Sequence, residues 1–490
     1  MLFNSVDFLV FFPLVTAGYY LLHPRFRWMW ILLASCYFYM VFRPVYILIL
    51  AFTIVVDYAA GLKIERSEGQ SRRFWLIASI VANVGVLAIF KYYNFLNHTA
   101  HDLAIPLGVN WSIPDLSMLL PIGLSFHTFQ SLSYTIEVYR RNQPAERHLG
   151  IFALYVMFYP QLVAGPIERP QNILHQFHQW HRYDTTNVRQ GLLLMGWGLL
   201  KKVAVADRLS PFVDTVYDSP AGWPGISYII ATFFFAIQIY CDFSGYSDVA
   251  LGSAQVMGFK LMKNFDMPYF STSVGEFWRR WHISLSTWFR DYVYIPLGGS
   301  RSPGVRRYVN LLVTFLVSGL WHGASWTYVI WGGLNGLYLV FEQVTGWVPS
   351  TQKDRATTRS GILRQVIGGI VTFTAISFAW IFFRAKNLSE ALLVVNGLGR
   401  DLLTLPSHLN DLGYIRANVM LNRPTKEFFT AIVCIVALTV AEAALRRAGG
   451  LNRLLELPRP TRWAVYYATM IGIVIFGAFN SVRQFIYFQF

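Results

Sequence analysis

Charged residues are scarce in this 490-residue chain, where they make up 14% of the composition, whereas hydrophobic residues make up 54%. An ordinary soluble domain carries about 25% charged residues. Apolar runs recur from Val6 to the C-terminal residues, and no polar stretch between them is long enough to fold separately. A membrane-spanning helix needs roughly 20 mostly apolar residues, so the sequence predicts an all-α, polytopic membrane protein of roughly 10 to 13 helical segments. We expect residues 1–490 to form a single integral-membrane domain.

Several catalytic and cofactor-binding motifs are missing. The chain has no His-Glu-x-x-His, no Gly-rich phosphate loop and no Gly-x-Ser-x-Gly, which argues against metal-dependent hydrolysis, nucleotide hydrolysis and serine-hydrolase chemistry. The three cysteines, Cys36, Cys241 and Cys434, are far apart in apolar surroundings. They support neither a disulfide framework nor a Cys-rich metal site. We therefore expect no bound metal and no permanently bound cofactor.

Acidic residues are also fewer than basic ones, which gives a formal net charge of +15. Lys and Arg gather in short loops at 25–27, 63–73, 140–147 and 446–462, a pattern explained by membrane topology and anionic lipids without a nucleic-acid partner. Cytoplasmic loops carry the excess of Lys and Arg in membrane proteins. This rule places both termini on the outer face, the periplasmic side of a bacterial inner membrane.

One apolar run, at 311–341, contains an ionisable residue, His322. Ionisable groups at membrane depth are costly and usually mark a functional site. An imidazole can lose its proton near neutral pH and act as a general base, so His322 is the leading catalytic candidate. A structural imidazole held by a neighbour is the alternative. His127 is a weaker candidate, because no partner follows it at catalytic or metal-binding spacing.

Residues 276–292 alternate aromatic side chains with Arg279, Arg280 and Arg290. This pattern is typical of an amphipathic helix at the lipid headgroup level. Alternatively, at least one of these arginines binds the phosphates of a cytoplasmic cofactor, since the planar guanidinium suits phosphate. His282 lies in the same segment and is either a packing residue or a partner of His322. Backbone rich in Pro, Gly and charge at 160–170 and 270–299 predicts re-entrant or interfacial helices there.

Two carboxylates, Asp242 and Asp248, follow another apolar run. Buried charges of this kind must be paired or hydrated. We expect structural pairing with Arg279, Arg280 or Lys260, and acid/base or cation sites are the alternative.

Four motifs resemble the membrane-bound O-acyltransferase family: Asn-Phe-Asp-Met-Pro-Tyr at 264–269, Phe-Trp-Arg-Arg-Trp-His-Ile-Ser-Leu-Ser at 277–286, Tyr-Ile-Pro-Leu-Gly-Gly at 294–299, and Gly-Leu-Trp-His-Gly at 319–323. The opening Met-Leu-Phe-Asn-Ser and the segment Tyr-Pro-Gln-Leu-Val-Ala-Gly-Pro-Ile at 159–167 are similar to its bacterial branch. That branch contains the membrane subunits that serve alginate O-acetylation and the D-alanylation of teichoic acids.

The resemblance implies a ring of helices whose thinned centre joins a cytoplasmic funnel to an outer funnel. It places His322 at the constriction, and it matches His282 to a second family position. It further implies transfer of an acetyl group, from acetyl-CoA as the expected donor, across the inner membrane for O-acetylation of an exported polysaccharide, with alginate as the leading candidate. Periplasmic acetyltransferase proteins are the expected partners.

The C-terminal residues 484–490 are strongly aromatic. They form either an anchor at the membrane interface or a tail whose Tyr487 hydroxyl receives the acyl group, by analogy with the tyrosine-bearing partner tail of the D-alanine system. The competing functions are a secondary transporter and a polysaccharide export or flipping component. The chain shows neither the internal repeat expected of many transporters nor a sizeable cytoplasmic domain.

Overall fold

The computed structural model describes residues 1–117, 121–347, 359–408, 410–479 and 485–486. This part of the chain is helical and contains no β-strand, as predicted. It forms two compact units, with unit 1 comprising Met1–Met195 and Val249–Met262, and unit 2 comprising Gly196–Asp248 and Lys263–Phe490. That both units act as one integral-membrane domain stays a prediction.

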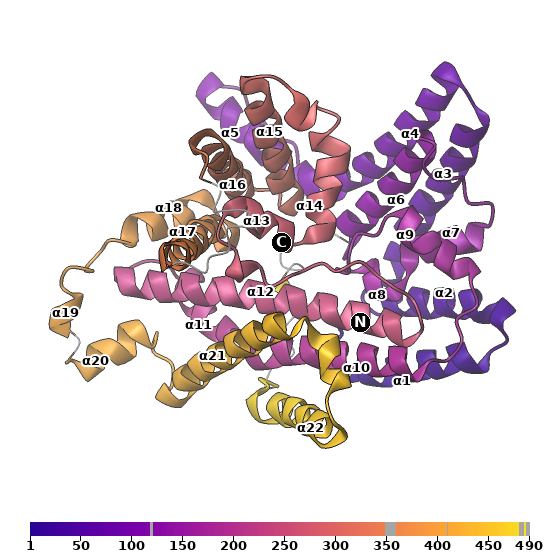
Figure 1. Cartoon of the computed structure of the whole chain (residues 1–490). Coiled ribbons are helices and arrows are strands. Elements are labelled where there is room, and N and C mark those ends of the chain that lie inside the picture. The colour runs from indigo at the N-terminus through magenta and orange to yellow at the C-terminus, as the bar shows by residue number, and fades with distance from the viewer. Residues whose placement is uncertain (118–120, 348–358, 409, 480–484, 487–490) are drawn as a thin grey trace. The chain divides into compact units, whose positions relative to one another are not determined.

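Unit 1 holds the N-terminal helices and the last turns of α12 (Figure 1). Its elements are α1 (Val6–Leu21), α2 (Pro24–Met40), η1 (Pro44–Tyr46), α3 (Ile47–Arg66), α4 (Gly69–Leu87), η2 (Ala88–Tyr92), α5 (Tyr93–Ala104), η3 (Ile105–Leu107), α6 (Leu124–Tyr139), α7 (Leu149–Met157), α8 (Tyr159–Leu162), α9 (Pro170–Ile173), η4 (Leu174–His178) and most of α10 (Thr185–Leu199).

Unit 2 begins within α10 and holds most of the long helix α12. Its elements are η5 (Leu200–Ala206), α11 (Asp207–Tyr217), α12 (Gly225–Val256), η6 (Pro268–Phe270), α13 (Val274–Arg280), α14 (Ile283–Phe289), η7 (Arg290–Tyr294), η8 (Gly299–Arg301), α15 (Val305–His322), α16 (Trp326–Thr345), α17 (Arg359–Arg384), α18 (Leu388–Gly397), α19 (Leu405–His408), α20 (Leu412–Tyr414), η10 (Ile415–Val419), α21 (Thr425–Ala448), η11 (Leu451–Glu456) and α22 (Arg459–Phe476).

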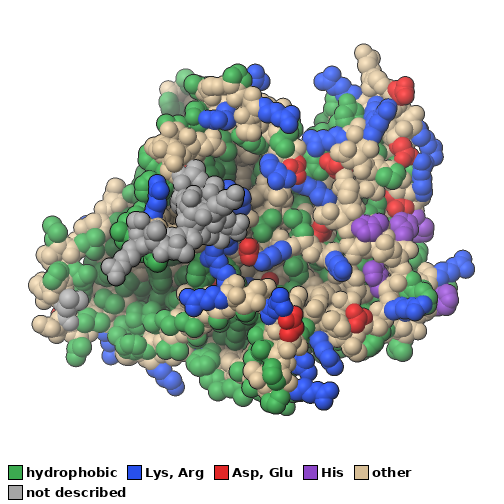
Figure 2. Space-filling model, in the orientation of Figure 1, with side chains coloured by type: hydrophobic (Ala, Val, Ile, Leu, Met, Phe, Trp, Pro, Cys, Tyr) green, Lys and Arg blue, Asp and Glu red, His purple; other side chains and the backbone are tan. Residues whose placement is uncertain are grey.

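Five helical stretches in the described residues are long and apolar enough to cross a membrane, namely Pro44–Arg66, Gly69–Leu107, Gly225–Val256, Gly361–Arg384 and Thr425–Ala448. Large apolar side chains are exposed along several helices, as on α22, where Val474 is 72% exposed. Figure 2 shows hydrophobic side chains over much of the face in view. Such surfaces suit a lipid solvent, because lipid tails are as apolar as these side chains.

The described residues form more helices than the roughly 10 to 13 helical segments predicted from the sequence. The predicted range assumed roughly 20 residues for each helix that spans the membrane. Pro, Gly and polar residues divide the chain into short helices at the segments where the sequence predicts broken backbone. At 160–170 these are α8 and α9, joined by a buried turn in which the Glu168 carboxylate accepts hydrogen bonds from the Met262 N–H and the Asn172 amide. Such irregular backbone is tolerated at membrane depth when it is buried in protein.

Several buried polar side chains of unit 1 hydrogen-bond one another where α3, α4 and α6 pack together. The buried Asp57 carboxylate accepts hydrogen bonds from Ser79 Oγ at 2.6 Å and from Asn83 Nδ2 at 2.8 Å. His127 Nε2 lies 3.0 Å from Thr53 Oγ1. These contacts join three helices, as expected where apolar solvent cannot satisfy a buried polar group.

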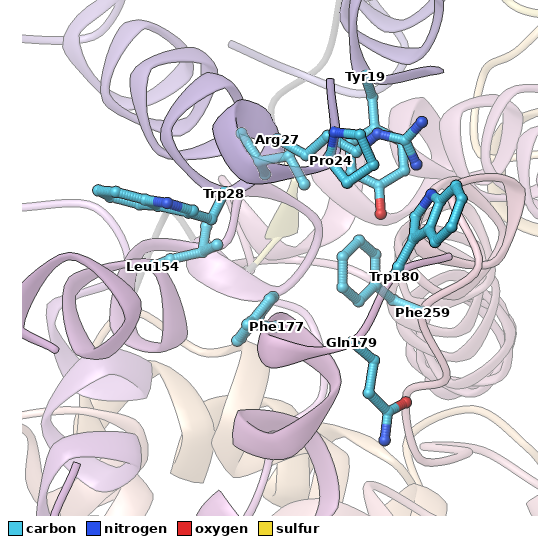
Figure 3. A pocket seen from close by; sticks show the side chains of 10 residues that line it. Tyr19, Pro24, Arg27, Trp28, Leu154, Phe177, Gln179, Trp180 and Phe259 are labelled. Carbon is cyan, nitrogen blue, oxygen red and sulfur yellow. The ribbon is translucent and has the colours of Figure 1, made fainter. Parts of the chain in front are cut away.

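Two further features of unit 1 are structural. A small pocket is lined by Arg27 and several aromatic side chains (Figure 3), but the Arg27 guanidinium already donates to the carbonyl oxygens of Leu22, Tyr20 and His181.

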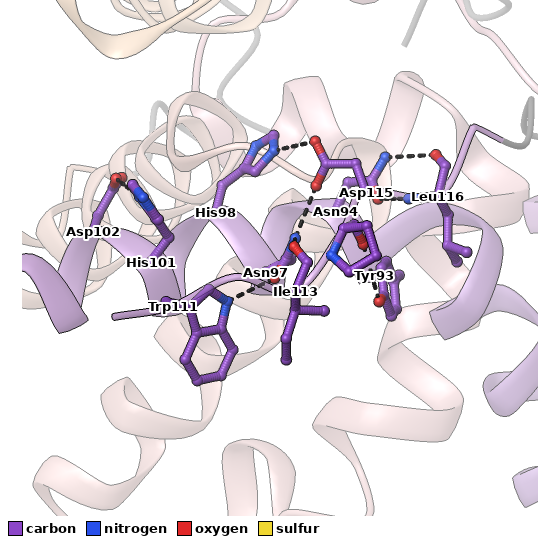
Figure 4. Close-up of polar contacts among 11 residues, drawn as sticks. Tyr93, Asn94, Asn97, His98, His101, Asp102, Trp111, Ile113, Asp115 and Leu116 are labelled. Atoms are coloured by element: carbon purple, nitrogen blue, oxygen red, sulfur yellow. Dashed lines mark hydrogen bonds and ion pairs between the residues drawn. The ribbon is translucent and has the colours of Figure 1, made fainter. Parts of the chain in front are cut away.

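Near α5, Asp115 accepts from Asn97 Nδ2 at 2.9 Å and lies 2.7 Å from His98 Nε2 (Figure 4). These bonds hold the segment after η3 against α5.

Candidate active site

His322 is the last residue of α15, and its side chain lies in the interior of unit 2. The apolar run at 311–341 is divided by a turn at 323–325, after which Ser325 caps α16 by accepting a hydrogen bond from the Thr327 N–H. Helices α15 and α16 run side by side (Figure 1). The turn fixes His322 at the end of a helical hairpin, where its ring faces neighbouring helices.

The α15–α16 pairing depends on two glycines that let the backbones approach closely. A Cβ atom on Gly319 would lie 2.2 Å from the Tyr328 carbonyl oxygen, and one on Gly332 would lie 2.3 Å from the Phe315 carbonyl oxygen. Small residues at helix interfaces allow this packing in membrane proteins. Because Gly319 lies one turn before His322, the close approach also sets the position of the imidazole.

Among the residues that the structure describes, three aromatic rings pack against the His322 imidazole. Its centroid lies 4.9 Å from Trp321, 4.9 Å from Trp331 and 5.4 Å from Phe383, each at a steep interplanar angle. Trp331 also stacks on Trp380, with centroids 5.6 Å apart. Edge-to-face packing of this kind restricts ring orientation and keeps water away from the imidazole.

His282 lies between α13 and α14 and is fully buried. Its backbone is left-handed, with φ 43° and ψ 55°, which is uncommon for a residue other than glycine. Two backbone hydrogen bonds between the motifs at 264–269 and 277–286 hold this conformation. The Ile283 N–H donates to the Asn264 carbonyl at 2.8 Å, and the Asp266 N–H donates to the Arg280 carbonyl at 2.9 Å. Strained residues of this kind often lie at functional sites.

The side chain of Asn264 determines the protonation of the His282 ring. His282 Nδ1 lies 3.2 Å from Asn264 Oδ1, which also accepts from Ser284 N–H at 3.2 Å and from Ser284 Oγ at 2.9 Å. The Asn264 amide nitrogen is directed to Ser247 Oγ at 3.2 Å. A carbonyl oxygen only accepts, so this network assigns the proton to Nδ1 and leaves Nε2 as the accepting nitrogen of a neutral ring. Burial lowers the pKa of His282 to about 3, which keeps the ring neutral near pH 7.

A continuous series of ring contacts joins the two histidines within unit 2. His282 packs against Phe265, Phe265 against Trp281, Trp281 against Trp380, and Trp380 against Trp331, which contacts His322. Both imidazoles therefore lie on one aromatic cluster.

The aromatic residues of 276–292 are not a lipid-facing stripe, so the interpretation as one amphipathic helix is wrong. The chain forms two short helices, α13 and α14, separated by the left-handed turn at His282. The aromatic side chains are buried and pack on α16 and α17, as when Trp278 meets Trp331 and Trp281 meets Trp380. The Glu342 carboxylate caps α13, accepting from the Gly275 N–H at 2.9 Å. The turn changes the direction of the chain, so that Trp278 and Trp281 face protein while Arg279 and Arg290 stay exposed.

The three arginines of this segment differ in their contacts. Arg280 forms ion pairs with Glu276 at 2.9 Å and with Asp266 at 3.5 Å, and it also donates to the Asp266 carbonyl. Arg290 is exposed and pairs with Asp291 at 2.7 Å. Arg279 is exposed at the end of α13. Their predicted role in binding cofactor phosphates stays a prediction.

Asp242 and Asp248 are paired, as expected, but with different cations from those predicted. Lys202 Nζ lies 2.5 Å from Asp242 and 2.7 Å from Asp207, and Lys201 Nζ lies 2.6 Å from Asp248. The prediction of Arg279, Arg280 or Lys260 as partners is therefore wrong. The sequence does indicate these cations, because Lys201 and Lys202 are adjacent lysines in an apolar run. A buried lysine, like a buried carboxylate, is costly unless it is paired with an opposite charge.

Two residues near the C-terminus, Phe485 and Ile486, lie in the same interior. Both are buried, and the Ile486 N–H donates to Asp242 Oδ2 at 2.6 Å. Phe485 stacks on Tyr246, and it also contacts Phe243, whose ring meets the His282 ring edge to face at 4.6 Å. The predicted acyl acceptor of the tail, Tyr487, lies outside the described residues.

Comparison with known proteins identifies the family. Residues 16–385 match the membrane-bound O-acyltransferase family, MBOAT. The chain is 39% identical over 395 residues to the probable alginate O-acetylase AlgI of Pseudomonas aeruginosa, covering 80% of this chain and 73% of that protein. It is 40% identical to the protein of the same name in Azotobacter vinelandii, with coverage of 80% and 76%.

A third relative extends over the whole chain. The peptidoglycan O-acetyltransferase of Helicobacter pylori is 32% identical over 533 residues, covering 100% of this chain and 98% of its own length. These matches agree with the motifs around His282 and His322 and with the apolar helices. The chain therefore belongs to the membrane-bound O-acyltransferase family, as a multi-pass membrane enzyme that transfers acyl groups to hydroxyls.

Proposed function

We propose that this enzyme transfers an acetyl group from acetyl-CoA, supplied at the cytoplasmic face of a bacterial inner membrane, to a hydroxyl acceptor at the outer face, with His322 as the general base. The observation that carries the proposal is the pair of buried histidines on one aromatic cluster. His322 is held at a helix end by the α15–α16 packing, and His282 is held in a left-handed turn by Asn264.

The reaction needs a base and a site for developing negative charge. The acceptor oxygen attacks the thioester carbonyl carbon while the His322 imidazole takes the hydroxyl proton. The tetrahedral intermediate then collapses, the carbon–sulfur bond breaks, and the proton passes from the imidazolium to the leaving sulfur, which gives the ester and free CoA thiol. A positioned base contributes about 10²- to 10⁴-fold to such a reaction.

His282 acts through its accepting nitrogen. With the proton on Nδ1 directed to Asn264, the neutral ring presents Nε2 as an acceptor. An acceptor nitrogen suits a role in orienting the acceptor hydroxyl or sharing its proton. It does not suit polarisation of the thioester carbonyl, which requires a donor.

Arg279 and Arg290 are the proposed contacts for the phosphates of CoA. Both are exposed, and an arginine fork binds phosphate in a bidentate manner. Arg280 is a weaker candidate than the other two, because Glu276 and Asp266 already engage its guanidinium.

The acceptor is proposed to be an exported glycan, reached with the help of periplasmic acetyltransferase partners. Alginate is the first candidate, because five of the relatives are named as probable alginate O-acetylases. Peptidoglycan is the second, because the peptidoglycan O-acetyltransferase matches this chain over its full length. Both chain termini are proposed to be periplasmic.

Tyr487 is proposed as the first acceptor of the acetyl group. An ester on a phenol is a better acyl donor than one on an alkyl hydroxyl, so onward transfer to a sugar is downhill. The described part of the tail is consistent with this role, because Phe485 contacts Phe243, which packs on His282.

The experiment is thioester consumption by purified enzyme in liposomes, with acetyl-CoA labelled in the acetyl group. Wild type should release CoA thiol and retain label on the protein after denaturation, whereas Tyr487→Phe should lose the bound label. His322→Ala should abolish both signals. A His127→Ala variant, altered in unit 1, controls for general damage. Thiol release at the normal rate by His322→Ala would refute the base assignment, and normal bound label in Tyr487→Phe would refute the acceptor.

A further inference from the structure

Three buried charged side chains lie close together beside Ile486. Lys202 lies within ion-pair distance of two carboxylates, Asp207 and Asp242. All three side chains are almost fully buried. A buried carboxylate is costly in an apolar interior unless cations or donors surround it.

The C-terminal segment supplies such a donor. Lys202 holds Asp242 Oδ1 at 2.5 Å, and the backbone N–H of Ile486 donates to the other oxygen, Oδ2, at 2.6 Å. A backbone donor does not depend on side-chain identity, and a charged acceptor makes the bond roughly twice as strong as a neutral one. The carboxylate therefore draws the backbone of the chain end into the interior of unit 2.

Aromatic rings on α12, the helix that carries Asp242, also contact the C-terminal segment. Asp242 and Tyr246 lie one turn apart on α12, and Phe485 stacks on Tyr246 with centroids 4.7 Å apart. Phe485 also packs at 5.3 Å on Phe243, which in turn meets His282 at 4.6 Å. Hydrogen bond and ring contacts together fix two consecutive residues of the tail next to the His282 side of the site.

We propose that Asp242 is a positioning residue that docks the C-terminal segment beside His282, and that Lys202, which is also paired with Asp207, holds the Asp242 carboxylate in place. Docking through Phe485 and Ile486 is independent of the chemistry. The expected effect on activity rests on the proposed function of the tail as acyl acceptor, because a released tail no longer delivers its residues to the site.

Carboxypeptidase trimming of the C-terminus, followed by mass spectrometry of the purified protein, tests docking directly. Asp242→Ala should be trimmed past Ile486 at least roughly tenfold faster than wild type, since a buried charged hydrogen bond is lost. Asp242→Asn keeps an oxygen that accepts the Ile486 N–H and should be trimmed at an intermediate rate. Asp248→Ala is the matched control, because it removes the Lys201 ion pair on the same helix and leaves the described contacts of Phe485 and Ile486 with Asp242, Phe243 and Tyr246 in place.

The outcomes separate docking from the acceptor role. Faster trimming of Asp242→Ala but not Asp248→Ala, with label transfer lost in proportion, supports the proposal. Equal trimming of wild type and Asp242→Ala overturns docking. Equal acceleration in Asp248→Ala also overturns it, because general loosening of α12 is then the cause. Faster trimming with full acetyl transfer in both Asp242→Ala and Tyr487→Phe leaves docking supported and overturns the acceptor role.

Discussion

The side chain of Asn264 sets the protonation of His282, and replacing it with aspartate should give this ring a pH dependence that it lacks near neutral pH in wild type. In wild type the Asn264 carbonyl oxygen accepts from His282 Nδ1 at 3.2 Å, and burial holds the imidazole neutral with a pKa of about 3. Asn264→Asp keeps the acceptor and its size but places a negative charge against the ring.

The magnitude follows from the geometry. A carboxylate within hydrogen-bond distance stabilises the imidazolium and raises the pKa of a histidine by about 1 to 3 units. For His282 this moves the pKa from about 3 to a value of roughly 4 to 6. At pH values below this raised pKa the His282 ring is mostly protonated and charged. The neutral ring, and with it the activity, should therefore be lost as the pH falls and regained as the pH rises.

The assay is the rate of CoA thiol release in liposomes between pH 5 and pH 8. The ratio of the Asn264→Asp rate to the wild-type rate should increase with pH, and the low-pH limb of the mutant should shift upward. Ser284→Ala is the control, because it removes one donor to the same Asn264 oxygen, at 2.9 Å, without altering His282. A mutant-to-wild-type ratio that stays constant across this range would refute the requirement for a neutral His282.

Three further outcomes follow from the geometry. His322→Ala should reduce acetylation of the exported polymer by at least about 10²-fold while leaving insertion and expression intact, as shown by polymer acetyl content and membrane protein level. Arg279→Ala and Arg290→Ala should weaken acyl-CoA binding in a salt-sensitive manner, whereas unchanged affinity in both would remove them from the donor site. Gly319→Val should force α15 from α16, lowering the thermal midpoint and the transfer rate together, because its side chain would collide with the Tyr328 carbonyl.

The sequence predicts the class of this protein well, because the class depends on local signals. Apolar runs and scarce charge predict an all-α membrane protein, and the structure and family match confirm this. An isolated histidine in an apolar run correctly indicates a buried position, since His322 lies inside unit 2. Its predicted role as base stays a prediction.

Contacts between residues far apart in the chain are what the sequence does not predict. The Lys202–Asp242 pair joins η5 to α12, and although the apolar run around Lys202 indicates that this lysine needs a carboxylate, nothing local indicates which carboxylate it meets. Likewise, the periodicity of 276–292 does not reveal the left-handed turn at His282, which depends on backbone bonds to Asn264 and Asp266. Packing decides which residues pair across the fold. Aromatic residues alternating with arginines are found both in helices at the lipid interface and in buried segments, so the pattern alone does not distinguish the two.

The aromatic surroundings of His322 give a physical reason for placing a base in an apolar site. A neutral imidazole is the form that accepts the hydroxyl proton. The uncharged rings of Trp321, Trp331 and Phe383 contact it, with centroids 4.9 Å, 4.9 Å and 5.4 Å from its own. With His322 as the proposed base, an imidazolium would form within the roughly 6 Å at which the face of an aromatic ring attracts a cation. For a ring that presents its face, this attraction would grow as the charge develops and would stabilise the transition state more than the ground state.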